Sequence, residues 1–300
     1  MNSAAVNMEL VFDTTALRSR VRDVLSKEFS HDFLFPDGDC EPGDRTSSVL
    51  LLLGEFAPRK GAVPEAGIIL NKRSQQVRQP GDLCCPGGGV EKFDHFLARL
   101  LSLGGSTLSK WPCWNRLKTA CPRDAAFLSL LYAAGLREGF EEMGINPFGL
   151  TFLGPLPTHC LIMYRQDIHP IVAWMSGQKR FRLSREVERI VRFPLRALLD
   201  PGNYACYRVN VPPHLQWRLK GESADFPAFV HTVDGRAELL WGATFRIVTT
   251  FLEMIFDFEV PDLGQLPLIC GRLDENYING GANDKRLRFC VPPALENSNE

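Results

Sequence analysis

Residues 137–145 read Arg-Glu-Gly-Phe-Glu-Glu-Met-Gly-Ile and hold three carboxylates and one arginine just before a glycine. Positions three and four apart share one face of a helix, so Glu138, Glu141 and Glu142 are expected to lie together. Like charges at this spacing repel each other by about 0.2–0.5 kcal/mol per exposed pair. Mg²⁺ or Mn²⁺ would neutralise them, because both ions prefer carboxylate oxygen. The pattern therefore indicates a divalent-metal site; the alternative is a solvated acidic helix face.

The surrounding pattern predicts that this stretch ends a long helix within an α/β fold. Residues 123–143 are expected to be helical, with Asp124 near the start and Gly144 as the stop. Apolar runs predict strands on both sides of the helix. These strands are expected at residues 48–56, 67–72, 148–156 and 168–175. Strands and helices mixed in this order favour helices on both faces of a mixed sheet.

The remaining segments are expected to extend this core. An amphipathic helix is predicted over residues 14–29 and a connector over 31–46. A short helix is expected at 194–199, and a long terminal helix over 238–258. Residues 206–236 contain several prolines and are expected to be irregular.

A glycine-rich stretch lies upstream of the acidic helix. It reads Pro86-Gly87-Gly88-Gly89-Val90-Glu91, and Asn71-Lys72-Arg73-Ser74 precedes it. Glycines let the backbone turn tightly and approach a ligand closely. Together with residues 137–145, this stretch resembles the Nudix box, Gly-x5-Glu-x7-Arg-Glu-U-x-Glu-Glu-x-Gly-U, where U is aliphatic. The resemblance implies a Nudix-type α/β/α sandwich and a hydrolase that uses Mg²⁺ or Mn²⁺ to cut the pyrophosphate of nucleotide derivatives.

The first half of the box is displaced along the chain. Counting back from Arg137, the Glu slot falls on Ser129 and the Gly slot on Arg123, while Gly139 occupies an aliphatic slot. Residues 92–122 therefore read as an insertion that splits the box, predicted to be a loop carrying a short helix beside the pocket mouth. Residues 206–236 read as a second insertion.

A narrower resemblance points to coenzyme A diphosphatases within the Nudix family. It rests on residues 68–74, on residues 81–88, and on the later Glu186-Val187 and Leu240-Trp241-Gly242-Ala243-Thr244. This resemblance implies hydrolysis of coenzyme A or acyl-coenzyme A to phosphopantetheine and adenosine 3′,5′-bisphosphate. Other Nudix substrates stay open: ADP-ribose, NADH or a nucleoside triphosphate. A catalytically weak, nucleotide-binding regulatory module is a third interpretation.

The Nudix resemblance also implies roles for individual residues. Metal ligands are expected at Glu138 and Glu142, with Glu141 as a direct or water-mediated ligand and the carbonyl of Gly88 as a further one. Arg137 is expected to orient the carboxylates.

The general base is expected either on the box helix, at Glu141, or on a later loop, where Glu186 is preferred over its neighbour Glu188. The residues expected to contact substrate are Lys72, Arg73, Gly87 and Gly88.

Domain limits follow from the same reading. Residues 1–45 are expected to form an N-terminal helical extension and connector, residues 46–260 the hydrolase domain with its two insertions, and residues 261–300 a C-terminal extension. A homodimer is the oligomeric state that the family resemblance suggests.

Composition limits the partners and the location. The chain has 300 residues, 45% of them apolar, and a formal net charge of −1, which argues against nucleic acid as the main partner. Arg246 and Glu253 interrupt the most apolar stretch, so no spanning segment and no membrane partner are expected. The nine cysteines include no Cys-x-x-Cys pair and suit a reducing cytoplasm, and no signal pattern opens the chain. A cytoplasmic enzyme with a small nucleotide substrate is therefore expected.

Overall fold

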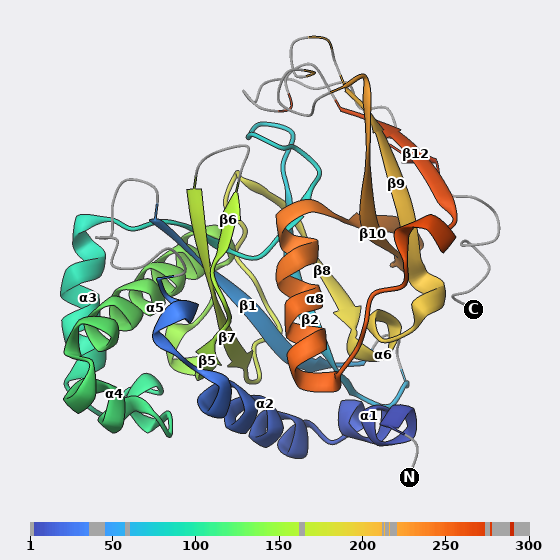
Figure 1. Cartoon of the computed structure of the whole chain (residues 1–300). Helices are drawn as coiled ribbons and strands as arrows, with labels where there is room; N and C mark the ends of the chain where they lie inside the picture. The colour runs from blue at the N-terminus through green and yellow to red at the C-terminus, as the bar shows by residue number, and fades with distance from the viewer. Residues whose placement is uncertain are drawn as a thin grey trace.

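A mixed β-sheet forms the centre of the molecule (Figure 1). The computed structural model describes residues 3–35, 46–57, 61–161, 166–211, 213, 216, 221–273, 277 and 289–290. Within these residues eight strands build the central sheet. They are β1 (Thr46–Phe56), β2 (Glu65–Arg73), β3 (Leu83–Cys84), β4 (Gly87–Gly89), β5 (Leu150–Pro155), β6 (His159–Leu161), β7 (Gln166–Met175) and β8 (Val187–Pro194).

Strands β1 and β7 are the parallel pair at the middle of this sheet. The strand order is β3-β2-β1-β7-β5. In addition, β4 pairs with β1, β6 with β7 and β8 with β2. Every pairing in this sheet other than β1–β7 is antiparallel. The strands predicted at 48–56, 67–72, 148–156 and 168–175 are confirmed within a few residues at their ends. A strand covered on both faces reads as a continuous apolar run, as Leu50–Leu53 of β1 do.

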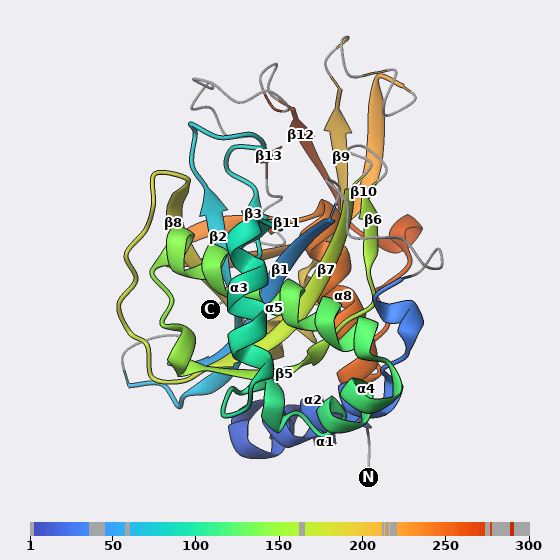
Figure 2. The same ribbon diagram turned by 90° about the vertical axis from the view of Figure 1, so that its left-hand side faces the viewer.

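Helices cover both faces of the sheet, as the two views show (Figures 1 and 2). Leu50 and Leu52 pack under one helical layer, whereas Leu51 and Leu53 pack under the other, because side chains alternate along a strand. The first layer contains α3 (Lys92–Ser102), α4 (Trp114–Ala120) and α5 (Pro122–Met143). The second contains α1 (Ser3–Phe12), α2 (Thr14–Glu28) and α8 (Gly242–Phe256). The predicted α/β/α sandwich is confirmed.

Helix α5 is the predicted helix of residues 123–143, and it ends as expected. Gly144 adopts the left-handed conformation, with φ 66°, and its amide donates to the carbonyls of Gly139 and Phe140. A residue without a Cβ takes this conformation with little strain. The short helix expected at 194–199 is α6 (Leu195–Leu198).

The expectation that residues 206–236 are irregular is wrong. Strands β9 (Tyr204–Asn210) and β10 (Ser223–Val233) lie in this range and belong to a second sheet, although residues 212, 214–215 and 217–220 lie outside the described part. Its other strands are β11 (Arg236–Leu240), β12 (Leu268–Arg272) and β13 (Phe289–Cys290). Pro227 is tolerated because β10 pairs only with β9 at that point, whereas β11 joins from Phe229 onward.

The predicted terminal helix at 238–258 also begins too early. Residues 236–240 form β11, in which Leu239 and Leu240 are buried on opposite faces of the second sheet. The helix, α8, starts only at Gly242. Two adjacent leucines are compatible with both the strand period of about 2 residues and the helix period of about 3.6 residues. The apolar pattern alone therefore did not show where the strand ends and the helix begins.

The insertion at 92–122 is more ordered than a loop with one short helix. It folds into α3, the 3₁₀ turn Leu108–Lys110 and α4, and α3 and α4 both pack against α5. Trp111 and Trp114 are almost fully buried in the core of this layer. In the part of the chain that the structure describes, every helix is too short or too polar to cross a bilayer.

His169 on β7 makes stability depend on pH. The ring is buried, its Nδ1 lies 2.8 Å from the Thr158 hydroxyl, and burial lowers its pKa to about 4. A histidine whose pKa is lower when folded stabilises the protein fully above about pH 6.5, and that contribution is lost as the pH falls toward 4.

We expect urea denaturation to show that the wild type loses about 2 kcal/mol more than His169→Asn between pH 7.5 and pH 5. The exposed His95→Asn is the control and should behave as the wild type. Equal losses in wild type and His169→Asn would refute this assignment.

Candidate active site

The buried side chain of Arg137 joins the acidic helix to its surroundings. Its Nη1 donates to Oε1 of Glu138 and to Oε2 of Glu141, each at 3.0 Å, and its Nη2 donates to the Gly89 carbonyl at 2.9 Å. Burial acts to lower the pKa of Arg137, but the hydrogen bond to Asp94 and the neighbouring carboxylates raise it overall. The orienting role predicted for Arg137 matches these contacts.

Asp94 completes this network, and sequence reasoning missed it. Its fully buried carboxylate accepts from Nε of Arg137 at 2.9 Å and from Nη2 at 3.2 Å, a bidentate pair. The same carboxylate accepts from the Glu91 amide at 2.7 Å and so caps α3.

The position of Asp94 offers a second way to count the box spacing. Counted forward from Gly88, the carboxylate slot at the sixth residue falls on Asp94, which places the extra chain after this slot. Ser129, where the slot falls when counted back from Arg137, meets the Ser102 hydroxyl at 3.0 Å, between α3 and α5. The forward spacing from Gly88 was the signal available in the sequence.

Glu142 is the most deeply held of the three box carboxylates. Only 8% of the residue is exposed, and the Asn71 amide donates to its Oε2 at 2.7 Å. Burial, Glu138 and Glu186 raise the pKa of Glu142, whereas Arg73 and the Gly87 amide lower it, and the net result is a pKa of about 8. A carboxylate buried next to like charges is a recognised mark of a functional site. Asn71, two residues before Arg73 on β2, is a second site residue that sequence reasoning missed.

Glu138 lies directly against the backbone of Gly88. A Cβ added at Gly88 would be 2.2 Å from Oε1 of Glu138, so only glycine permits this approach. Strand β4 is held there by pairing with β1, which places Gly88 opposite Ser48. Burial raises the pKa of Glu138, and Arg137 opposes that shift. The structure therefore brings together Gly88, Glu138 and Glu142, which were predicted as metal ligands.

The donor set in this site suits a hard divalent cation. Two partly desolvated carboxylates, Glu138 and Glu142, lie close enough to affect each other, and the backbone of Gly87 and Gly88 on β4 lies against them. Oxygen donors of this kind match Mg²⁺ or Mn²⁺. Glu141 is half exposed and bonded to Arg137. Among the residues that the structure describes, no three His, Cys, Asp or Glu side chains are already gathered as a metal cluster.

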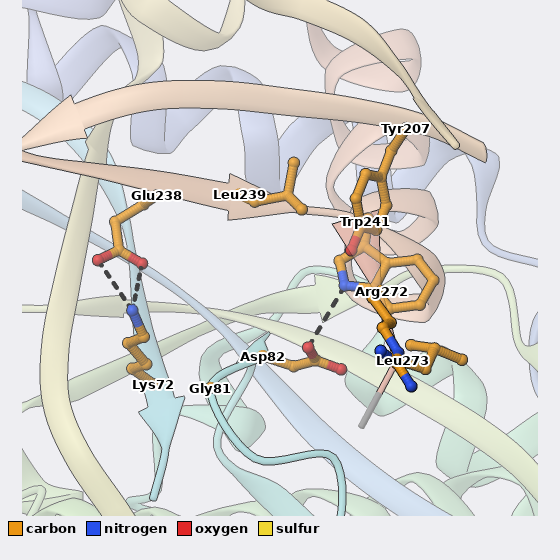
Figure 3. A pocket seen from close by; sticks show the side chains of 9 residues that line it. All are labelled: Lys72, Gly81, Asp82, Tyr207, Glu238, Leu239, Trp241, Arg272 and Leu273. Atoms are coloured by element: carbon orange, nitrogen blue, oxygen red, sulfur yellow. Dashed lines mark hydrogen bonds and ion pairs between the residues drawn. The ribbon is translucent and has the colours of Figure 1, made fainter. Parts of the chain in front are cut away.

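The two predicted substrate-contacting cations behave differently. Arg73 is close enough to Glu142 to affect its pKa, and its Nε donates to the Arg78 carbonyl at 2.7 Å. Lys72 instead points into a crevice beside the second sheet, where its Nζ lies 3.1 Å from Glu238 (Figure 3). Successive strand residues point to opposite faces, so Lys72 is turned away from Asn71 and Glu142. The structure therefore does not place Lys72 with the other site residues.

Glu186 lies near the site, at the turn before β8. Its carbonyl accepts from the Ser74 amide at 2.8 Å, and its charge affects the pKa of Glu142. Glu188 is exposed on β8, and the largest influences on the pKa of Glu142 include Glu186 but not Glu188. The choice of Glu186 over Glu188 as the base stays a prediction.

Comparisons with known proteins find similarity in solved structures alone. No family model and no curated protein matches this sequence. Similar structures include a C. elegans Ap4A hydrolase binary complex, with 14% identity and TM-score 0.32, covering 51% of this chain and 82% of that one. The NUDIX domain of Shewanella oneidensis NrtR complexed with ADP ribose has 13% identity and TM-score 0.31, covering 57% and 87%.

A MutT/nudix family protein from Enterococcus faecalis has 10% identity and TM-score 0.36, covering 79% of this chain and 73% of that protein. At these identities and TM-scores, the function of this chain rests on the geometry of its own site.

Removal of the Asp94 carboxylate should destabilise the protein. Asp94→Ala leaves the buried Arg137 without its bidentate partner, and we expect a loss of about 3 kcal/mol in the free energy of unfolding. Urea denaturation measures this loss. Glu91→Gln is the matched control, since Glu91 lies 3.9 Å from Arg137 with an exposed side chain, and it should cost less than about 1 kcal/mol. An Asp94→Ala protein as stable as the control would contradict the central role of this pair.

Proposed function

We propose that this chain is a metal-dependent hydrolase that cleaves the pyrophosphate bond of a nucleotide derivative. The observation that carries the proposal is a pair of neighbouring carboxylates, the partly buried Glu138 and the buried Glu142, held beside the β4 backbone by contacts with Arg137, Asn71 and Gly88. Burying like charges together costs stability, and a bound cation is the simplest group that offsets the cost. We also propose a reducing, cytoplasmic location, in keeping with free thiols at seven cysteines of the described chain.

Each residue has a defined task in this proposal. A bound Mg²⁺ or Mn²⁺ supplies charge neutralisation at the phosphates and lowers the pKa of water. Glu138, Glu142 and the Gly88 carbonyl hold the ion, and Glu141 is a further or water-mediated ligand. Asn71 and the Gly87 amide fix the Glu142 carboxylate. Arg137 orients Glu138 and Glu141 through its two bonds of 3.0 Å.

Arg73 is the cation best placed to meet substrate phosphate, since it lies near Glu142 on the carboxylate side of β2. Glu186 is proposed as the base that accepts the proton of the attacking water. Glu141 is the alternative base, but one of its oxygens already accepts from Arg137. A base must reach the proton that it removes.

Coenzyme A or acyl-coenzyme A is the proposed substrate, with phosphopantetheine and adenosine 3′,5′-bisphosphate as products. The support is the sequence resemblance at residues 68–74 and 81–88, the segment that supplies Asn71, Arg73 and Gly87 to the site. The second candidate function is hydrolysis of the same type of pyrophosphate bond in a different substrate: ADP-ribose, NADH or a nucleoside triphosphate. The similar NrtR domain was solved with ADP ribose, which makes that ligand a necessary member of any test.

A substrate panel decides between these candidates. Hydrolysis of coenzyme A, acetyl-coenzyme A, ADP-ribose, NADH and ATP is measured with Mg²⁺ and with Mn²⁺, and products are identified by mass. We expect the highest kcat/KM for a coenzyme A species. Equal or better rates with ADP-ribose would overturn the coenzyme A assignment and leave the hydrolase assignment intact. Binding without turnover of any compound would support the regulatory-module interpretation instead.

Neutralising Glu142 tests the site itself. Glu142→Gln keeps the side-chain shape but removes one ligand charge, and the loss of several kcal/mol of charge stabilisation predicts at least a 100-fold drop in kcat, on the order expected for a metal ligand. Calorimetry with Mn²⁺ should show weaker uptake by the same variant. Glu188→Gln is the matched control, because Glu188 is an exposed glutamate on β8. Full turnover by Glu142→Gln would remove Glu142 from the proposed machinery.

A further inference from the structure

Helix α3 exposes an apolar stripe on its outer side. Phe93, Phe96, Leu100 and Leu103 recur at spacings of three and four, which places them along one line of the helix. Each residue is between 48% and 81% exposed. The opposite side of α3 is already used, since Asp94 and Ala98 are buried against α5. The helix is therefore apolar on a face that nothing in the described chain covers.

Basic residues border this stripe. Lys92, His95 and Arg99 lie beside it on the same helix and are all exposed. The segment 92–123 as a whole has six lysines and arginines and one acidic residue, Asp94, although the chain is nearly neutral. Asp94 is fully buried in its pair with Arg137, so the exposed charged residues of this segment are all cations, and one exposed carboxylate, Glu91, precedes them at the start of α3. The six basic residues are Lys92, Arg99, Lys110, Arg116, Lys118 and Arg123, and all are exposed.

The place of α3 in the fold leaves the stripe accessible. Figure 2 shows α3 in front of α5, on the outside of the helical layer that covers the central sheet. Buried Trp111 and Trp114 anchor the rest of the insertion in that layer. The stripe is thus presented by a firmly packed helix.

We propose that the outer face of α3 binds the surface of an anionic phospholipid membrane. Phenylalanine and leucine side chains enter the boundary between headgroups and acyl chains, and flanking lysine and arginine contact anionic headgroups. The helix lies in the plane of the surface and does not span it, because its 11 residues are far too few. Every helix in the described part of the chain is too short or too polar to cross a bilayer, and this mode of contact needs no spanning segment. The inference does not depend on the proposed hydrolase activity.

Two other occupants fit the observations less well. A second copy of the chain would use the same patch on both partners, which would bring Lys92, His95 and Arg99 toward their own equivalents. Nucleic acid would satisfy the cations but would leave the phenylalanines and leucines against a polar backbone. An anionic bilayer satisfies both halves of the surface.

Vesicle co-sedimentation of the full chain tests this proposal. Wild type should sediment with vesicles of mixed phosphatidylcholine and phosphatidylserine, should not sediment with phosphatidylcholine alone, and should dissociate as salt is raised. The double variant Lys92→Glu/Arg99→Glu should bind the mixed vesicles at least about 30-fold more weakly, because loss of the two positive charges alone accounts for that factor, and Phe96→Ser/Leu100→Ser should also lose binding. Because all four side chains are exposed, circular dichroism should show unchanged folding.

Matched controls distinguish binding by this face of α3 from a general effect of surface charge or surface hydrophobicity. Arg22→Glu/Lys27→Glu reverses two exposed cations on α2, in the opposite layer, and Phe148→Ser removes an apolar side chain that is 95% exposed. Both should bind as the wild type. The proposal is overturned if wild type stays in solution with anionic vesicles, or if the α3 variants bind unchanged. It is also overturned if light scattering shows a wild-type dimer that Phe96→Ser/Leu100→Ser converts to a monomer.

Discussion

One buried guanidinium holds the candidate site together. Arg137 contacts α3 through Asp94, β4 through the Gly89 carbonyl, and its own helix through Glu138 and Glu141. A buried cation left without its partners costs several kcal/mol, so three separate pieces of chain are constrained to meet around it. The position of the glycine-rich strand relative to the acidic helix follows from this constraint. Gly88 can then touch Glu138 because the two elements are already fixed.

The same arrangement leaves the carboxylates in an unfavourable environment. Glu142 is buried with Glu138 and Glu186 near it, whereas Asn71, the Gly87 amide and Arg73 favour its charged form. The pKa of Glu142 is raised to about 8, so the groups and the burial that disfavour the charge outweigh those that favour it. A protein selected for stability alone gains nothing from this geometry, whereas a site that takes up a cation does. A bound divalent cation would therefore offset the electrostatic cost of burying Glu142 beside Glu138 and Glu186, a cost that the rest of the fold otherwise has to compensate.

Most helices and strands could be predicted from local sequence patterns. The site residues could be predicted less well, because their positions depend on which segments meet in the folded chain. The helix ending at Gly144 and the strands β1, β2 and β7 have clear periods and stops, so the pattern located them. Asp94 was missed because the spacing was counted back from Arg137 across an insertion. Lys72 was misplaced because strand alternation turns it away from its neighbour Asn71. The second sheet was missed because Pro227 suggests a loop, and only the register shows that β10 lacks a partner on one side there.

Helix α3 contacts the candidate site through its buried side. Asp94 lies on the buried side of α3, so the first turn of the helix that leads into the inserted chain supplies a carboxylate that Arg137 needs. The outer side of the same helix carries Phe93, Phe96, Leu100 and Leu103 in the open. The inner side of α3 thus fixes Arg137 through Asp94, while the outer side of the same helix carries the exposed stripe.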